Sequence, residues 1–562
     1  MPTINPRSAT DLRFFIPYAA NYITEVIANH GFNAGFIDLN KWYWNLDVTY
    51  KEIGEEEFVY FIEHNKISKG IRNLIDRIKV DFSVGVEDNV LYLLSKDFFS
   101  FELNDRSLLL LITIAKFLKE SGKLNIVIIG GSHSKKEFMQ RVITNFTCID
   151  YAFYNEIWSK PNYDDLMDCL MDIESNNITE RNNLNRRNYF YRSCDGSIQD
   201  NNPQPQEIHR GRFINPFPKY EFLNMGYNFS IEDICDKKFL ESYPILLKKI
   251  IEGILTVKFT NGCVNKCAYC KGSKLPLQIE SIAKTIDYME FLSKEKGFRH
   301  LFFLNRELNM TPIYLRRFCR EIVKRKLQIR WTDSFDINNL TPDDVALIKE
   351  AGCIQVTVGI DTTSQKIGSM VGRQVKLGHM EKIFKLLHEE EIWIRANIIV
   401  GFPYQSAEDI EDDIKFLTRN EEFIQHLNIS EFKLFPHTLC GDSPNRYGLR
   451  IIDTGLQMNK LLQQDNPSQN YFSYKFDETK GRQWEEVVDF TKKSFERLTN
   501  IRNTTQDYLA ACLPLIFLLY DVFTKKSEVS SFISSYSKYL LAEKRVNILS
   551  KKDFLNCKLK QV

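Results

Sequence analysis

Hydrophobic positions in the first third of the chain alternate between helical spacing and short apolar runs. Residues 14–29 have apolar side chains at helical spacing, and a glycine break separates them from the apolar run 34–39, which predicts a buried strand. The same order recurs at 108–119 and 124–129, and two glycines follow the second strand. Alternating helices and strands with glycine-rich strand ends predict a doubly wound, Rossmann-like α/β domain over residues 1–175.

The middle of the chain repeats a strand-then-helix pattern. The expected strands are 254–259, 300–304, 328–331, 353–360, 393–400 and 431–435. The expected helices between them include 312–325, 342–352, 376–391 and 407–420. Units of this kind in series predict a parallel, partial (β/α)6 barrel over residues 246–450. In such barrels the active site lies at the carboxyl ends of the strands.

Two further regions complete the expected organisation. Residues 176–245 are rich in Asn, Arg, Gln and Asp, and a strand-like pattern around the Asp195-Gly196 turn predicts a hairpin in this linker. Residues 451–562 predict a helical C-terminal domain with helices at 484–498, 505–523 and 527–541.

Composition narrows the functional classes. A chain of 562 residues suggests two to four domains, and a net charge of +1 gives no case for a nucleic-acid partner. The 12 cysteines do not form a disulfide framework, and residues 1–12 lack the apolar core of a secretory signal. The longest apolar run, 509–520, is too short to span a membrane and contains Pro514. We therefore expect a cytoplasmic protein that makes no use of a membrane.

Three cysteines form the strongest chemical signal. Cys263, Cys267 and Cys270 stand at C-x3-C-x2-C spacing directly after the expected strand 254–259. Clustered thiolates are soft ligands that suit iron–sulfur clusters or zinc. Four thiolates would complete a 4Fe–4S cluster, so three leave one iron open. A zinc site with a missing ligand is the alternative, but it does not predict the strand–helix units that follow.

The motif resembles that of the radical S-adenosylmethionine (SAM) superfamily, which also has an aromatic residue before the third cysteine. Residues 359–364 (GIDTTS) and 397–403 (NIIVGFP) resemble that superfamily's fourth and fifth strand ends. The resemblance implies a 4Fe–4S cluster and bound SAM, with Tyr269 on the adenine, Asp361 near the amino group or ribose, and Asn397 on the methionine or ribose. The alternative is that Asp361 and Asn397 only cap the helices that follow them.

The N-terminal region resembles the cobalamin-binding domain of cobalamin-dependent radical SAM enzymes. The similar stretches are 30–40, 127–133 and 149–156. The resemblance implies a cobalamin site at the strand end formed by Gly130, Gly131, Ser132 and His133. The sequence has no D-x-H-x-x-G motif, so it does not support a histidine-ligated cobalamin. The alternative is a degenerate Rossmann-like domain without a cofactor.

Together these patterns predict a cobalamin-dependent radical SAM enzyme. The expected reaction is methyl transfer to an unactivated carbon of a peptide or natural product, because the layout resembles maturases of ribosomally made peptides. An electron donor such as flavodoxin or ferredoxin is the expected partner, and Cys440 is a candidate donor or ligand near the active face. Two alternatives stay open. One is radical chemistry without methyl transfer, such as epimerisation, cyclisation or rearrangement, and the other is a non-catalytic binding protein with a structural cluster.

Overall fold

The computed structural model describes most of the chain. The described residues are 15–16, 18–35, 53–81, 90–94, 106–130, 136–154, 160–174, 188–201, 217–221, 226–435, 438–453, 473–502 and 504–543.

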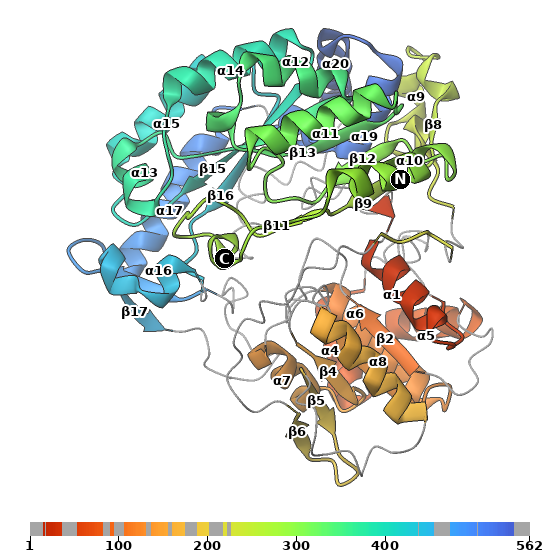
Figure 1. The fold of residues 1–562 in the computed structure, drawn as a ribbon. Helices are drawn as coiled ribbons and strands as arrows, with labels where there is room; N and C mark the ends of the chain where they lie inside the picture. Colours follow the sequence, from red (N-terminus) through yellow and green to blue (C-terminus); the bar gives the residue numbers. More distant parts are fainter. Residues whose placement is uncertain are drawn as a thin grey trace.

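A seven-stranded, fully parallel sheet forms the centre of the molecule (Figure 1), with the strand order β1-β9-β12-β13-β14-β15-β16. Its strands are β1 (Phe15–Ile16), β9 (Ile254–Val257), β12 (His300–Phe303), β13 (Arg330–Phe335), β14 (Cys353–Asp361), β15 (Trp393–Val400) and β16 (His426–Glu431). The predicted parallel barrel sheet is therefore confirmed.

Three strands of this sheet differ from the prediction. β13 spans Arg330–Phe335, whereas 328–331 was expected. The last strand is His426–Glu431 and not 431–435. This strand alternates apolar and polar residues, with Leu427 and Ile429 in the core. The prediction placed the strand too late because it followed the apolar residues that come after it. The first strand, β1, comes from a segment where helical spacing predicts a helix, and only Tyr18–Asn29 (α1) is helical there.

Helices cover the outer face of the barrel sheet (Figure 1). They are α10 (Ile282–Lys294), α11 (Pro312–Lys324), α12 (Pro342–Glu350), α13 (Gln365–Val371), α14 (Leu377–Glu389) and α15 (Ala407–Arg419). Local sequence explains their starts: the side chains of Thr311, Thr341 and Ser406 accept hydrogen bonds from backbone N–H groups in the first turns of α11, α12 and α15. The bounds of these three helices and of α14 agree with prediction to within two residues.

C-terminal helices close the barrel at the amino ends of its strands. They are α18 (Thr504–Ala511), α19 (Leu513–Val522) and α20 (Lys526–Ala542), whereas α17 (Trp484–Thr499) packs along β15 and β16 and reaches the mouth, where Thr491 lies against Gly401. The single helix expected over 505–523 is broken at Cys512, whose extended backbone precedes Pro514 in the first turn of α19. The apolar residues of α19 pack with Phe15, Ile254 and Trp393. Within the described residues, no helix is long and apolar enough to cross a membrane.

A second sheet forms an N-terminal α/β unit with strand order β2-β3-β4-β5-β6. Its strands are β2 (Val90–Leu94), β3 (Ile126–Gly130), β4 (Tyr151–Phe153), β5 (Tyr189–Arg192) and β6 (Ile198–Asp200), and its helices are α1, α4 (Glu55–His64), α5 (Lys69–Asp81), α6 (Arg106–Glu120), α7 (Lys136–Asn145) and α8 (Lys160–Glu174). Val127 and Ile129 pack with α4 to α7, whereas Ile128 packs with α1 and α8. Helices therefore cover both faces, as predicted for a doubly wound sheet.

The hairpin expected in the linker is present as the antiparallel pair β5–β6. Of the strand expected over 34–39, residues 34–35 have no regular structure and the remainder lies outside the described residues.

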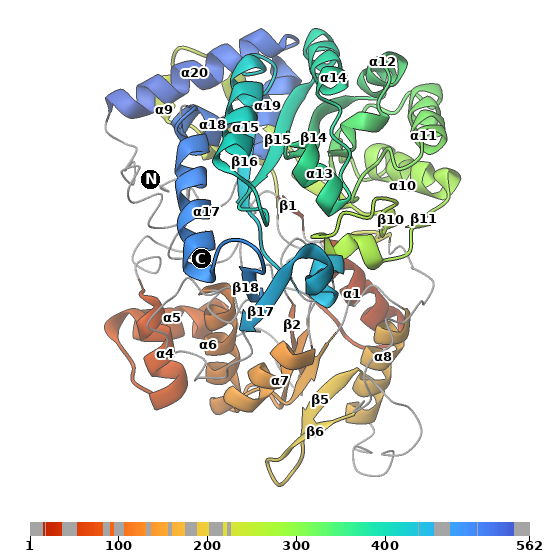
Figure 2. The same ribbon diagram turned by 90° about the vertical axis from the view of Figure 1, so that its left-hand side faces the viewer.

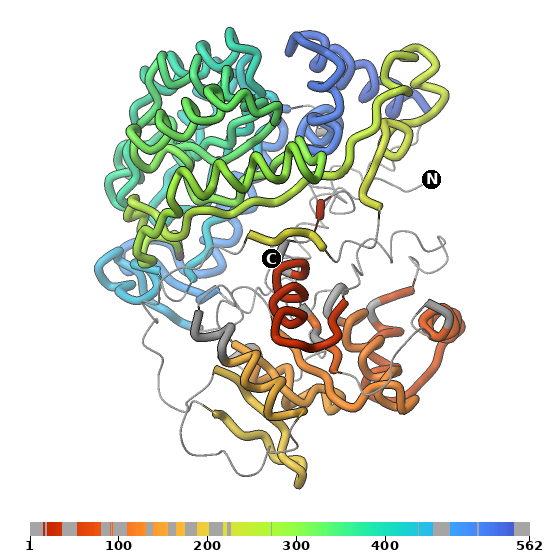
Figure 3. Tube along the Cα trace, turned by 45° about the vertical axis from the view of Figure 1, so that its right-hand side comes forward, coloured from red at the N-terminus to blue at the C-terminus, as the bar shows by residue number. Residues whose placement is uncertain are grey.

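The N-terminal unit faces the carboxyl ends of the barrel strands. Figures 1 and 2 both show it on the side of α16 (Leu439–Asp442) and β17 (Leu449–Asp453), which pairs with β18 (Lys475–Glu478), while α19 and α20 lie at the opposite end. Helix α1 of the N-terminal unit contacts the linker segment 217–221 (Figure 3). Glu25 in this helix accepts hydrogen bonds from the backbone N–H groups of Lys219 and Glu221.

Candidate active site

The cysteine loop lies at the carboxyl end of β9, which is the barrel mouth. It starts from the short antiparallel pair β10 (Thr260–Asn261) and β11 (Gln278–Ile279). Gly262 adopts φ +75°, and a Cβ at this position would lie 2.2 Å from the carbonyl oxygen of Pro276. Only glycine fits this close approach without strain, so the backbone sets the course of the loop before the cysteines begin.

The three thiols are suited to an iron–sulfur cluster. Cys263 and Cys267 are buried and Cys270 is half-buried. Burial raises the pKa of Cys263 to about 11 and that of Cys267 to about 12, and a charge on Cys270 raises both. In a 4Fe–4S cluster each thiolate binds a different iron, and among the described residues no three His, Cys, Asp or Glu side chains are arranged around a single metal ion.

Polar side chains beside the loop form one connected network. Asn265 donates hydrogen bonds of 2.9 Å to both carboxylate oxygens of Glu307, and one of 3.3 Å to Asp336. The thiol of Cys263 lies 3.7 Å from Glu307 Oε2. Burial, followed by the charge of Asp336, raises the pKa of Glu307 to about 7, although Arg373 and Asn265 act in the opposite direction. The network therefore places an acid–base group directly against a cysteine.

Arg373 is the cation at the centre of this network. Its guanidinium donates to the carbonyl of Gly359 at 2.7 Å and lies 3.1 Å from Asp361 Oδ2. Glu307 and Asp336 are both 3.9 Å away. Burial opposes its charge, but the carboxylates of Asp361 and Asp336 outweigh this and the pKa of Arg373 is raised. The mouth therefore holds one buried guanidinium among three acidic side chains.

Tyr269 and Asp361 meet at the mouth. The Tyr269 hydroxyl donates a 2.8 Å hydrogen bond to Asp361 Oδ2, and the Tyr269 ring packs edge-on against Phe402. Asp361 has φ +59° at the end of β14, a strained conformation for a residue other than glycine. The cap of the following helix is Ser364, so the alternative that Asp361 only caps a helix is wrong. Strain of this kind is common at ligand-binding sites.

Asn397 lies deeper, within β15. Its Oδ1 accepts a 3.2 Å hydrogen bond from Asn428 on the adjacent strand. The cap of the next helix is Ser406, so the capping alternative is also wrong for Asn397. The Gln405 side-chain oxygen holds the backbone N–H groups of Gly401 and Phe402, which orders the end of β15.

The remaining predicted residues lie elsewhere. Cys440 is buried in an apolar cluster with Ala268 and Phe402, and its backbone N–H donates to the Ala268 carbonyl at 2.9 Å, so it supports the outside of the cysteine loop. Gly130 is the last residue of β3. Gly131, Ser132 and His133 lie outside the described residues.

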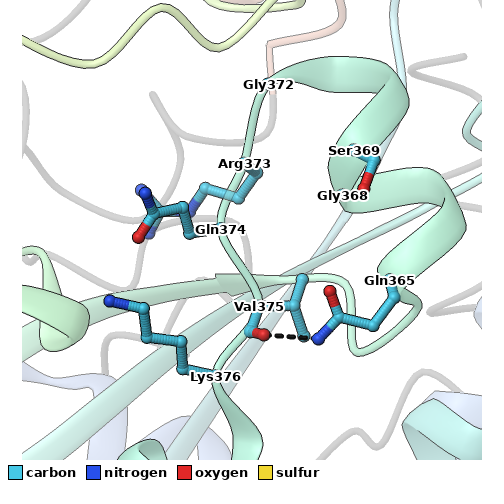
Figure 4. A pocket seen from close by; sticks show the side chains of 8 residues that line it. All are labelled: Gln365, Gly368, Ser369, Gly372, Arg373, Gln374, Val375 and Lys376. Atoms are coloured by element: carbon cyan, nitrogen blue, oxygen red, sulfur yellow. Dashed lines mark hydrogen bonds between the residues drawn. The ribbon is translucent and has the colours of Figure 1, made fainter.

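A pocket of about 420 Å³ adjoins the mouth beside α13. Figure 4 shows its lining from α13 and the loop 372–376, where the Gln365 side chain donates to the Val375 carbonyl. The same loop carries Arg373 into the mouth. Sequence patterns missed Arg373 and Asp336, and the only local signal for Arg373 is its place directly after the glycine that ends α13.

Comparisons with known proteins identify the central part of the chain. Residues 257–417 match the sequence model of the Radical SAM superfamily. These residues form a radical SAM domain. The superfamily uses SAM and a 4Fe–4S cluster, and Cys263, Cys267 and Cys270 are the residues here that would hold the cluster.

Curated relatives match over limited stretches. An anaerobic magnesium-protoporphyrin IX monomethyl ester cyclase from Rubrivivax gelatinosus is 26% identical over 28% of this chain and 29% of its own length. A tryptophan 2-C-methyltransferase from Streptomyces laurentii is 23% identical over 40% of this chain and 42% of its own length. The chain thus spans less than half the length of these two relatives.

One solved structure resembles the whole chain. The radical SAM methyltransferase TsrM from Kitasatospora setae, solved with cobalamin and a [4Fe-4S] cluster bound, has a TM-score of 0.55 and 13% identity. The match covers 94% of this chain and 97% of that one. At this identity the likeness concerns the fold, which comprises both the N-terminal α/β unit and the barrel.

Proposed function

We propose that this protein is a cobalamin-dependent radical SAM methyltransferase that acts on an unactivated carbon of a peptide or natural product. The observation that carries the proposal is the cysteine loop at a barrel mouth that faces a doubly wound N-terminal unit. The TsrM fold, which has this arrangement, binds both cobalamin and the cluster, and a relative is a C-methyltransferase. The bound groups would supply a 5′-deoxyadenosyl radical and a transferable methyl group.

The residues of the chain have separate roles in this proposal. Cys263, Cys267 and Cys270 would hold the cluster and leave one iron open for SAM. Tyr269 packs on the adenine, and Asp361 binds the amino group or the ribose, with Arg373 compensating its buried charge. Asn397 contacts the methionine or ribose portion. The strand end at Gly130, with Gly131, Ser132 and His133, would provide the cobalamin site. The surrounding barrel excludes water from the radical.

Anaerobic reconstitution tests the proposal. With iron, sulfide, hydroxocobalamin and a low-potential reductant, the protein should convert SAM to 5′-deoxyadenosine and retain a corrinoid after desalting. Cys267→Ala should abolish the nucleoside, and Cys440→Ala is the matched control that should retain it. An electron donor such as flavodoxin or ferredoxin would replace the reductant in a reducing cytoplasm.

One alternative has a specific observation in its favour. The cyclase from Rubrivivax gelatinosus matches part of the radical SAM domain, and its name does not describe methyl transfer. A radical reaction without methyl transfer, such as cyclisation, epimerisation or rearrangement, therefore remains the second candidate. Production of 5′-deoxyadenosine by a protein that retains no corrinoid would favour this candidate over the methyltransferase.

A further inference from the structure

Alternate residues of β15 and β16 face the inside of the barrel. Ile394 and Ala396 pack in the core beneath the outer helices, so Arg395 between them points into the lumen. Leu427 of β16 packs in the same core, which turns His426 to the lumen side. Arg395 and His426 are register partners on adjacent strands, so they occupy the same level of the barrel.

The guanidinium of Arg395 has no paired carboxylate among the described residues, and its Nε atom is buried without a hydrogen-bond partner. Burial lowers the pKa of Arg395, and Asp507 offsets this only in part. The Asp507 carboxylate is already engaged by Arg502 at 2.8 Å and by His426 at 3.0 Å. Arg395 is half-buried, and a partly desolvated guanidinium without a counter-charge is unfavourable unless a ligand provides the anion.

His426 presents a second unpartnered nitrogen at this level. Its Nδ1 lies 3.0 Å from both the backbone carbonyl and the carboxylate of Asp507, which fixes the orientation of the ring. Its Nε2 is buried and has no partner among the described residues. A ring held in this way by a carboxylate on one nitrogen can offer the other nitrogen to a ligand.

The barrel is closed just below this level. Trp393 comes two residues before Arg395 on β15, is buried, and donates its indole N–H to the Ala510 carbonyl at 3.1 Å. One level above Arg395, Asn397 pairs with Asn428. Arg395 therefore lies on the floor of a lumen that is reached from the mouth, where the cysteine loop is.

We infer that Arg395, together with His426, binds a carboxylate group of the substrate at the lumen floor. This inference rests on the radical SAM function proposed above and assigns a substrate class to it. The planar guanidinium matches a carboxylate in shape, and bidentate pairing satisfies its exposed donors. The Asp507 carboxylate is shared by Arg502 and His426, so it does not neutralise the guanidinium of Arg395, and the site fits an anion. SAM also carries a carboxylate, but the residues proposed to bind SAM lie nearer the mouth. The cluster loop and Asp361 are at the mouth itself, and Asn397 lies roughly 7 Å farther along β15 toward the mouth than Arg395 does.

Thermal unfolding of the anaerobically reconstituted full-length protein tests the inference with small probes. Sodium acetate should raise the apparent melting temperature by about 1–3 °C relative to sodium chloride at equal ionic strength. Acetamide, the neutral isostere, should give no such rise. Arg395→Met should remove the acetate effect, and it should also raise the melting temperature without acetate, because a half-buried charge without a counter-charge is replaced by an apolar side chain.

Arg330→Met is the matched control. Arg330 lies on β13 of the same sheet and its Nε is 2.6 Å from Asp521, so this change breaks an existing pair. It should lower the melting temperature and leave the acetate effect intact. The inference is overturned if Arg395→Met lowers the melting temperature without acetate, or if acetate stabilises Arg395→Met as much as the wild type.

Addition of SAM separates the two sources of the carboxylate. Acetate and SAM should stabilise the wild type additively if the site belongs to the substrate. If saturating SAM abolishes the acetate effect, the site holds SAM and the substrate assignment is overturned. A wild-type protein that responds to acetate but forms no 5′-deoxyadenosine would instead contradict the proposed function, so the two failures are distinguishable.

Discussion

At the scale of single residues, the barrel mouth depends on one buried cation. Arg373 lies within 3.9 Å of three carboxylates, those of Glu307, Asp336 and Asp361, and its side chain is 6% exposed. Its partners come from the carboxyl ends of three strands: Glu307 follows β12, Asp336 follows β13, and Asp361 ends β14. Sequence patterns cannot reveal such a group, because its members are far apart in the chain until the fold brings them together.

Arg373→Gln should therefore destabilise the protein strongly. Removing the guanidinium leaves the buried carboxylate of Asp361 without its counter-charge, which should lower the free energy of unfolding by about 3 kcal/mol in urea denaturation. Arg419→Gln is the control, because Arg419 pairs with Glu381 but is 62% exposed, and the expected loss is below about 1 kcal/mol. Equal losses in the two variants would contradict a central role for Arg373.

Gly262 allows a second test at this scale. Gly262→Ala places a Cβ against the Pro276 carbonyl and should displace the cysteine loop, so iron and sulfide per chain after reconstitution should fall several-fold. Gly297→Ala is the control, because Gly297 also has a positive φ (+79°) but no atom lies within 4 Å of its Cβ position. If both variants load iron equally, the close approach at Gly262 does not shape the loop.

At the scale of elements, most bounds follow from local chemistry. Side-chain caps and N-terminal prolines fix the starts of α11 and α12, and prediction placed them correctly. Prediction was wrong where tertiary context overrides local preference. β1 carries an apolar helix-like pattern but pairs with β9, and α18 and α19 were expected as one helix. Residues from distant parts of the chain decide these cases, so a local pattern cannot.

Asp413 of α15 links two strand ends and makes the stability of the folded protein depend on pH. It accepts hydrogen bonds from the backbone and hydroxyl groups of Thr363 after β14, and from Gln405 after β15. Burial raises the pKa of Asp413 from 3.8 to about 7. Between pH 3.8 and about 7, the Asp413 carboxyl group is therefore protonated in the folded state and ionised in the unfolded state. The stabilisation is complete below about pH 4 and is lost as the pH rises through about 7.

Asp413→Asn should reduce this dependence. Relative to the variant, the wild type should gain on the order of 2–4 kcal/mol between pH 7.5 and pH 4.5, measured by urea unfolding at each pH. Asp412→Asn is the control, because the Asp412 side chain is 67% exposed and its charge is the smallest cause of the raised Asp413 pKa, so the profile should change only slightly. A wild type that becomes more stable than Asp413→Asn as the pH rises would contradict the assigned direction.

At the scale of the whole molecule, the C-terminal helices form part of the barrel. α19 closes the floor with side chains that are almost completely buried, and Phe517 packs edge-on against His300 at the start of β12. Phe517→Ala should lower the free energy of unfolding by about 3–5 kcal/mol, measured by denaturant unfolding. Leu541→Ala near the end of α20 is the control, because Leu541 is 38% exposed and should change stability by less than about 0.5 kcal/mol. Similar effects would mean that α19 is not part of the barrel core.

The sequence by itself determined the spacing of the three cysteines, the parallel barrel and the doubly wound N-terminal unit. The cysteine spacing is a local property of one loop, and strand–helix periodicity repeats often enough to define the architecture. Only the tertiary structure decided the Arg373 network, the closure of the floor by α19, and the unpaired guanidinium of Arg395 in the lumen. Each of these depends on burial and on contacts between residues distant in the chain, and the free energy of a charge depends on what surrounds it after folding.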